Sequence, residues 1–156
     1  MLSRYGKWRA AKASGAIRLR FKVALVEKIS LFEGLSAKEV EQLARLVTER
    51  EVPAGTQLAT AGEPGGELFA IVDGEAAVKT RTGKTATLKA GDYFGEMSLI
   101  DGQPRSATVR ATTPIRLLAL EQRDFWRVVD GTTSIARKIM QTLCRRLREA
   151  EGGAAK

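Results

Sequence analysis

The sequence predicts an α+β fold in which an antiparallel β-barrel or sandwich is flanked by N-terminal and C-terminal helices. From about residue 55 to residue 120, short apolar stretches alternate with glycine-containing turns at spacings near ten residues. Before and after this region, apolar residues recur at helical spacing instead. A chain of 156 residues, with 44% hydrophobic and 28% charged residues, is large enough for one domain with a single core.

Two helices are expected before the strands. The first spans 17–32, where apolar residues lie at partly helical spacing. The second begins after Ser36, which can form a capping box with Glu39 three residues later. This helix has one apolar face, formed by Val40, Leu43, Ala44, Leu46 and Val47. We expect the helical region to end at Pro53.

The middle of the chain predicts six short strands. They are separated by turn signals, of which Asp73-Gly74 is the strongest. A short helical stretch at 96–100 interrupts the series. In chain order the expected strands are 57–61, 68–72, 76–80, 85–88, 108–111 and 115–120.

Helix returns at Glu121 and is interrupted near Gly131. Either Thr132 or Thr133 is expected to cap a last helix. The apolar face of that helix steps by four residues through Ile135, Ile139, Leu143 and Leu147. Cys144 lies beside this face and is expected to behave as a small hydrophobic residue.

The composition excludes several classes of site. The sequence has no histidine, which rules out Ser-His and Cys-His nucleophiles and histidine-ligated metals. Its single cysteine permits neither an internal disulfide nor a cysteine-cluster metal site, which fits a cytoplasmic location. No apolar run approaches the ~18 residues of a membrane-spanning helix.

The net charge of +8 is concentrated at the N-terminus. Residues 1–26 contain seven basic residues and no acidic residue, whereas the rest of the chain is nearly neutral. We favour a solvated, partly helical arm. A transit peptide, or contact of residues 1–22 with a nucleic acid or an anionic membrane surface, stays open.

Residues 94–108 carry the strongest functional signal. Gly95 precedes a short helix, whose free backbone N–H groups attract an anion. Arg105 offers a charged fork suited to phosphate oxygens, and Ser106 adds a hydroxyl and an N–H group. An acidic residue such as Glu96 is unfavourable beside a phosphate alone, but it is explained if it accepts a hydrogen bond from a sugar hydroxyl. The competing interpretation is that Glu96 and Arg105 form only a structural salt bridge.

This stretch resembles the phosphate-binding cassette of the cyclic nucleotide-binding domain family. That family occurs in protein kinase A regulatory subunits, catabolite activator protein and cyclic nucleotide-gated channels. The matching segments are Phe94-Gly95-Glu96 and Pro104-Arg105-Ser106-Ala107-Thr108-Val109. Shorter matches in the same order extend the resemblance over about residues 25–150.

The resemblance implies a β-roll or jelly-roll barrel with a short phosphate-binding helix. The binding domain would span 25–150, after a basic arm at 1–24 and before a disordered tail at 151–156. Glu96 would bind the ribose 2′-hydroxyl, and Arg105 the cyclic phosphate. Serine at position 106 implies a preference for cAMP with some tolerance of cGMP. The remaining implied nucleotide contacts are the backbone N–H groups of Gly95, Met97, Ser98 and Ser106, and the pocket walls Val72 and Leu88.

The resemblance also places an arginine of the last helix near the purine. Arg146 is the first candidate, with Arg145 and Arg148 as substitutes, and a solvated basic helix end is the alternative. The chain departs from catabolite activator protein at Ala150 and Glu151, where that protein has a Thr-Ser pair reaching the adenine. This departure argues against a dimer in which both subunits contact the base.

We therefore expect a stand-alone, non-catalytic receptor for cAMP, with cGMP as a second ligand. Binding would move the C-terminal helix and so regulate a partner protein that the sequence does not identify. The oligomeric state is not predicted. The alternatives are a relative of transcription regulators that uses its basic arm, although no helix-turn-helix segment is expected after Glu151, and a degenerate domain without ligand. No positioned nucleophile accompanies Glu96, so an enzyme is not expected.

Overall fold

The computed structural model describes residues 17–152. Most of the basic arm, including Arg4, Lys7, Arg9 and Lys12, and the tail from 153 onward lie outside the described residues. The division into an arm, a domain and a tail stays a prediction, but helices at 19–26 and 133–152 run across the expected boundaries 24/25 and 150/151, and residues 151 and 152 are helical rather than disordered. In chain order the elements are α2 (Leu19–Val26), the 3-10 turn η1 (Ser30–Phe32), α3 (Ala37–Ala44), β1 (Thr48–Val52), β2 (Gln57–Ala59), β3 (Glu67–Asp73), β4 (Ala76–Thr80), β5 (Thr85–Leu88), β6 (Tyr93–Phe94), α4 (Glu96–Asp101), β7 (Ala107–Ala111), β8 (Ile115–Glu121), α5 (Gln122–Gly131) and α6 (Thr133–Gly152).

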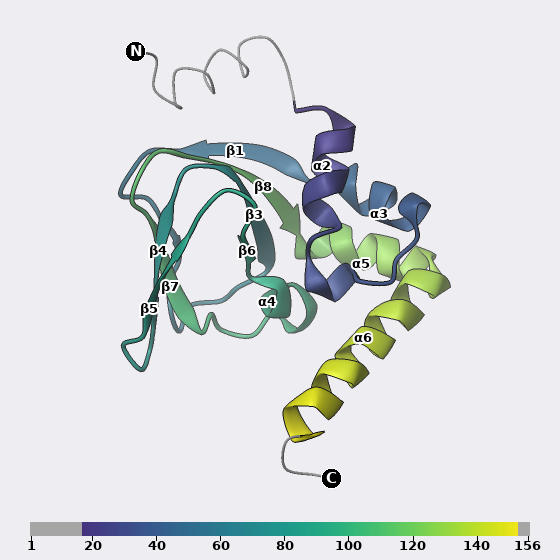
Figure 1. The fold of residues 1–156 in the computed structure, drawn as a ribbon. Coiled ribbons are helices and arrows are strands. Elements are labelled where there is room, and N and C mark those ends of the chain that lie inside the picture. The colour runs from purple at the N-terminus through teal and green to yellow at the C-terminus, as the bar shows by residue number, and fades with distance from the viewer. Residues whose placement is uncertain (1–16, 153–156) are drawn as a thin grey trace.

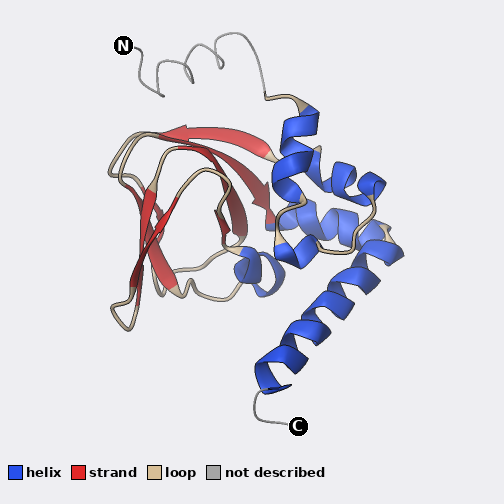
Figure 2. Cartoon of the chain, viewed as in Figure 1, coloured by secondary structure: helices blue, strands red, loops and turns tan. Residues whose placement is uncertain are grey.

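Two antiparallel four-stranded sheets face each other (Figure 1). One has the strand order β1-β8-β3-β6, and the other has the order β2-β7-β4-β5. Figure 2 shows the helices gathered on one side of these sheets, except for α4, which lies between β6 and β7 in the chain. The α+β fold class is confirmed, with the strands arranged as a jelly-roll-like sandwich of two sheets.

Strand β3 separates two hydrophobic cores. Because side chains alternate across a strand, Leu68 and Ala70 face the helices while Phe69 and Ile71 face the second sheet. Strand β8 alternates in the same way and is buried along almost its whole length. The continuous apolar run of β8 thus reflects a strand that is covered on both faces.

Three details of the expected secondary structure were wrong. The helix expected over 17–32 is α2 followed by η1, because Ile29 is extended and directs Leu31 into the core. The second helix ends at Ala44 rather than continuing through Val47. Strands β1 and β6 were not expected; β1 forms because it pairs with β8 from Thr48↔Ala119 to Val52↔Ile115.

The capping box at the start of α3 is confirmed. The Glu39 backbone N–H donates to Ser36 Oγ at 3.2 Å, and the Ser36 N–H donates to Glu39 Oε1 at 2.8 Å. The same carboxylate accepts hydrogen bonds from Ser134 Oγ and, at 2.7 Å, from Lys138 Nζ. One buried carboxylate therefore joins the first turn of α3 to the first turns of α6.

Replacing Lys138 by alanine should lower the free energy of unfolding by about 1–2 kcal/mol at pH 7, because Glu39 would lose a charged hydrogen-bond donor. The hydrogen bonds from Lys138 and Ser134 lower the pKa of Glu39 from 4.5 to about 2. This stabilisation is therefore full above pH 4.5 and is lost as the pH falls toward 2. Chemical denaturation of the wild type and K138A between pH 2 and 7 measures the difference, which should shrink on acidification. The exposed neighbour Arg137, replaced by alanine, is the control, and an equal effect there would contradict the assignment.

Candidate functional site

The site is built around the start of α4. Gly95 caps this helix with φ +89°, a left-handed conformation that favours glycine. A Cβ atom at Gly95 would lie 2.4 Å from the Glu67 backbone oxygen and 2.5 Å from Arg105 Nη1. Gly95 is therefore required both by its backbone conformation and by the close approach of β3 and the arginine.

The loop 62–66 fixes the backbone of Arg105. The Arg105 N–H donates to the Glu63 carbonyl, and the Gly62 N–H donates to the Arg105 carbonyl, both at 2.8 Å. A Cβ atom at Gly65 would lie 2.9 Å from Arg105 Nε and 2.5 Å from Ser98 Oγ. Gly65 was not predicted as a site residue; the Gly65-Gly66 pair in a turn was the signal available.

Arg105 is a buried cation that lacks a full set of partners. Its side chain is only 8% exposed, and Nη1 is buried without a hydrogen-bond acceptor. The guanidinium carbon lies 5.9 Å from the centroid of the Phe69 ring. Burial lowers the pKa of Arg105, while the nearby charge of Glu67 opposes that shift. A buried N–H group of this kind needs an acceptor, and an anionic ligand can supply one.

Most of the predicted site residues lie around one cavity of about 350 Å³. One side of the cavity is polar, and the other is closed by small apolar residues of the second sheet. The predicted residues that line it are Leu88, Gly95, Glu96, Met97, Ser98, Arg105 and Ser106, and the apolar wall adds Val78, Ala86 and Val109. The cavity thus combines a buried cation, an acidic side chain and an apolar wall, which suits a ligand that is anionic at one end and apolar at the other.

Val72 does not line this cavity. It packs against the core on the helical side of β3, because it alternates with Ile71, which faces the second sheet. The wall position that the sequence analysis gave to Val72 belongs instead to residues of the second sheet, such as Val78.

Arg146 reaches the site through Glu96. Its Nη2 lies 3.3 Å from Glu96 Oε2, and its Nη1 lies 3.5 Å from Glu96 Oε1. Arg146 also donates to Ser30 Oγ, and the Tyr93 hydroxyl donates to the same oxygen at 3.0 Å. Ser30 and Tyr93 were not predicted, because Ser30 is distant in sequence from Glu96, Arg146 and Tyr93, and only the fold brings these four residues together.

The other two arginines considered for this role lie elsewhere. Arg145 pairs with Glu33 at 2.8 Å and with Glu149 at 3.7 Å, and Arg148 is exposed. The structural salt bridge considered between Glu96 and Arg105 does not form in the described part of the chain, since the ion-pair partner of Glu96 is Arg146. The carboxylate and the buried guanidinium therefore line one cavity without neutralising each other.

Residues 49–132 match the family model of the cyclic nucleotide-binding domain. The chain belongs to this family. The matched segment runs from β1 to the end of α5 and contains every residue that lines the cavity, whereas Arg146, the ion-pair partner of Glu96, lies beyond it on α6.

Two curated relatives show the range of proteins in which this domain occurs. The chain is 38% identical over 122 residues to a cyclic nucleotide-gated potassium channel of Mesorhizobium japonicum. The aligned residues cover 78% of this chain and 34% of the channel. It is 37% identical over 106 residues to a cAMP-dependent protein kinase regulatory subunit of Yarrowia lipolytica, and this alignment covers 67% of this chain and 28% of the subunit. The chain thus spans about a third of the length of these relatives.

Solved structures agree with the fold. A cyclic nucleotide-binding domain from Methylobacillus flagellatus superposes with a TM-score of 0.65 at 32% identity, covering 87% of this chain and 82% of that one. The N-terminal domain of a transcriptional regulator from Streptomyces coelicolor A3(2) has a TM-score of 0.74 at 26% identity, covering 85% and 98%. The family is regulatory rather than catalytic, and its members act in several kinds of protein.

Proposed function

We propose that this chain is a receptor for cAMP that also tolerates cGMP. The observation that carries the proposal is the buried Arg105 guanidinium, whose Nη1 lacks an acceptor at the edge of a cavity that Glu96 shares. A cyclic phosphate would supply the missing acceptor, and a ribose 2′-hydroxyl would donate to Glu96. The name of the kinase regulatory relative supports cAMP as the first ligand.

The base would lie against the apolar wall of the cavity. Ser106 lines the cavity and has a hydroxyl group that can accept a hydrogen bond from the guanine amino group, which favours tolerance of cGMP. No step in this proposal breaks or forms a bond, and we infer a regulatory rather than catalytic role. In the proposal the chain acts in the cytoplasm. A separate finding is that no helix among residues 17–152 is long and apolar enough to span a membrane.

The output of the receptor would be the position of α6. An ion pair with Arg146 ties this helix to Glu96, the same carboxylate that the ribose would use. An incoming 2′-hydroxyl competes for the Glu96 oxygens, so Arg146 becomes available to the purine, and the preferred position of α6 shifts. A regulated partner protein would sense that shift. Most of residues 1–22, the segment considered for contact with a nucleic acid or a membrane, lies outside the described residues.

Calorimetric titration tests the binding step. We expect saturable binding of cAMP, weaker binding of cGMP, and no binding of AMP, because the open-chain phosphate carries an additional charge and a different geometry. Failure of both cyclic nucleotides to bind would contradict the proposal.

The movement of α6 can be followed with spin labels. Cys144, which the sequence predicted to behave as a small hydrophobic residue, is instead exposed on α6 and can carry one label. Lys84 in the β4–β5 turn, replaced by cysteine, can carry the other. We expect the distance between the labels to change on addition of cAMP. In R146Q the ligand-free distance distribution should broaden, because α6 loses its tie to Glu96. An unchanged distance in the fully cAMP-bound wild type would contradict the proposed output.

A further inference from the structure

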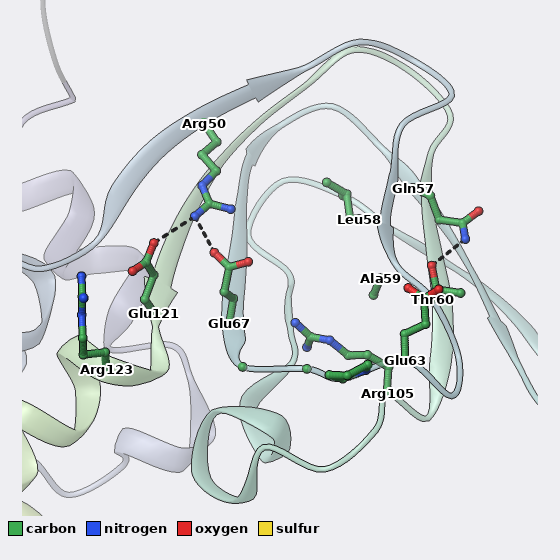
Figure 3. A pocket seen from close by; sticks show the side chains of 13 residues that line it. Arg50, Gln57, Leu58, Ala59, Thr60, Glu63, Glu67, Arg105, Glu121 and Arg123 are labelled. Atoms are coloured by element: carbon green, nitrogen blue, oxygen red, sulfur yellow. Dashed lines mark hydrogen bonds and ion pairs between the residues drawn. The ribbon is translucent and has the colours of Figure 1, made fainter.

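Arg105 also lines a second cavity, of about 660 Å³. Its lining is mostly polar and includes Arg50, Glu67, Glu121 and Arg123 together with Arg105. Figure 3 shows the Arg50 side chain between the carboxylates of Glu67 and Glu121, with the Arg105 guanidinium near Glu67. Arg105 therefore lines both the cavity that holds Glu96 and a second cavity that contains charges of both signs.

Arg50 holds the two carboxylates. Its Nη2 lies 2.5 Å from Glu67 Oε2, an ion pair without the alignment of a hydrogen bond, and 3.4 Å from Glu121 Oε1. The guanidinium of Arg50 also lies 5.8 Å from the centroid of the Phe69 ring, which Arg105 approaches at 5.9 Å. The strands β1, β8 and β3, which are adjacent in one sheet, fix this arrangement.

Glu67 attracts Arg105 but does not pair with it. The charge of Glu67 raises the pKa of Arg105, so the two side chains interact electrostatically. Within residues 17–152, however, no carboxylate forms an ion pair with the Arg105 guanidinium, and the ion-pair partner of Glu67 is Arg50. Direct pairing of Glu67 with Arg105 would occupy the guanidinium that a phosphate needs.

We infer that Arg50 is a positioning residue for nucleotide binding: by holding Glu67, it leaves the Arg105 guanidinium free for the cyclic phosphate. This inference rests on the proposed function. Arg50 lies on the edge strand β1 and does not line the cavity that holds Glu96 and Ser106, so it acts through Glu67 rather than by touching the nucleotide.

Calorimetry of three variants tests the inference. In R50M, Glu67 is released toward Arg105, and we expect the Kd for cAMP to rise about tenfold, the scale of one altered charge contact in a partly buried site. In the double variant R50M/E67Q the competing charge is absent, so the Kd should return to within about twofold of the wild type. The exposed Arg123 lines the same cavity, and R123M removes the same charge as a matched control that should leave the Kd unchanged.

Two results would overturn the inference. One is an unchanged Kd in R50M, and the other is a double variant that binds as weakly as R50M, since the inference makes the released Glu67 charge the cause of the weaker binding. Thermal unfolding of each variant shows whether it remains folded, and a Kd that follows stability rather than the Glu67 charge also counts against the inference.

A measurement without nucleotide separates this inference from the proposed function. The Arg105 Nε–Hε resonance in ligand-free protein should shift in R50M, as Glu67 approaches, and should return toward its wild-type position in R50M/E67Q. An unshifted resonance overturns the inference whether or not nucleotide binds. If the resonance shifts as expected while the wild type binds no cyclic nucleotide, Arg50 controls the Glu67–Arg105 contact and the proposed ligand is wrong.

Discussion

Replacing Arg105 by glutamine should weaken cAMP binding by about 100-fold or more, the loss expected when a charged donor to a phosphate is removed from a buried site. The same substitution should leave the ligand-free protein as stable as the wild type, or more stable. Arg105 Nη1 is buried without an acceptor, and burial lowers the pKa of Arg105. The charged guanidinium therefore costs the ligand-free folded protein desolvation free energy that no hydrogen bond to Nη1 offsets. Glutamine is shorter and uncharged and removes that cost.

The opposite signs of these two effects distinguish a binding arginine from a structural one. Calorimetry measures the first effect and thermal unfolding without nucleotide measures the second. With cAMP at about 100 times the Kd, the wild type should gain about 2.7 kcal/mol of stability, whereas R105Q should gain almost none. Arg110 is an exposed arginine on β7, the strand that follows Arg105 in the chain, and R110Q is the control expected to bind normally. A strongly destabilised R105Q, or one that binds cAMP like the wild type, would contradict the assignment.

The parts of the fold with a local sequence signal could be predicted. Ser36 and Glu39 form the expected capping box, and β4 and β5 have the expected bounds because glycine turns delimit them. The helix after Gly95 and the position of Arg105 follow from a contiguous motif in which each residue type has a physical role. These features depend on neighbours within a few residues along the chain.

Strand β1 could not be predicted in this way. Its sequence, Thr-Glu-Arg-Glu-Val, is mostly charged because the strand lies at the edge of its sheet and its side chains form long-range ion pairs. Two of these pairs are Glu49 with Arg116 and Arg50 with Glu67. The partners of Arg50 come from other strands, β3 and β8, so no pattern in the residues around Arg50 predicts them.

The site shows the same division. Glu96 was predicted as a ligand of the sugar, but its pairing with Arg146 depends on how α6 crosses the molecule. Val72 was misplaced because the family pattern gives its strand but not which face of the strand the residue occupies. The residue types within the motif predict the chemistry of the site. The face of a strand that a residue occupies, and the residues that α6 brings to the site, can be read only from the three-dimensional structure.

Replacing Gly95 by alanine should lower both stability and affinity, and Gly83 offers a matched control. Both glycines have nearly the same positive φ, +89° at Gly95 and +91° at Gly83, but a Cβ atom at Gly83 would meet no atom within 4 Å. G83A should therefore lose only the ~1–2 kcal/mol that a left-handed conformation costs an L-residue. G95A carries the same strain and in addition places a methyl group 2.4 Å from the Glu67 carbonyl oxygen.

The extra loss in G95A comes from backbone that has little freedom to move. Glu67 begins β3, which is paired with β8 from Glu67↔Glu121 onward, so the start of α4 must shift instead. We expect G95A to be about 3–4 kcal/mol less stable than the wild type, with the excess over G83A within the range of overpacking costs. The methyl group would also displace Arg105 Nη1, so we expect the Kd for cAMP to rise about 100-fold in G95A, as for loss of a charged phosphate contact, and to stay unchanged in G83A. Equal effects of the two substitutions on stability and Kd would show that backbone conformation alone, and not the close packing of α4 against Glu67 and Arg105, determines the requirement for glycine at position 95.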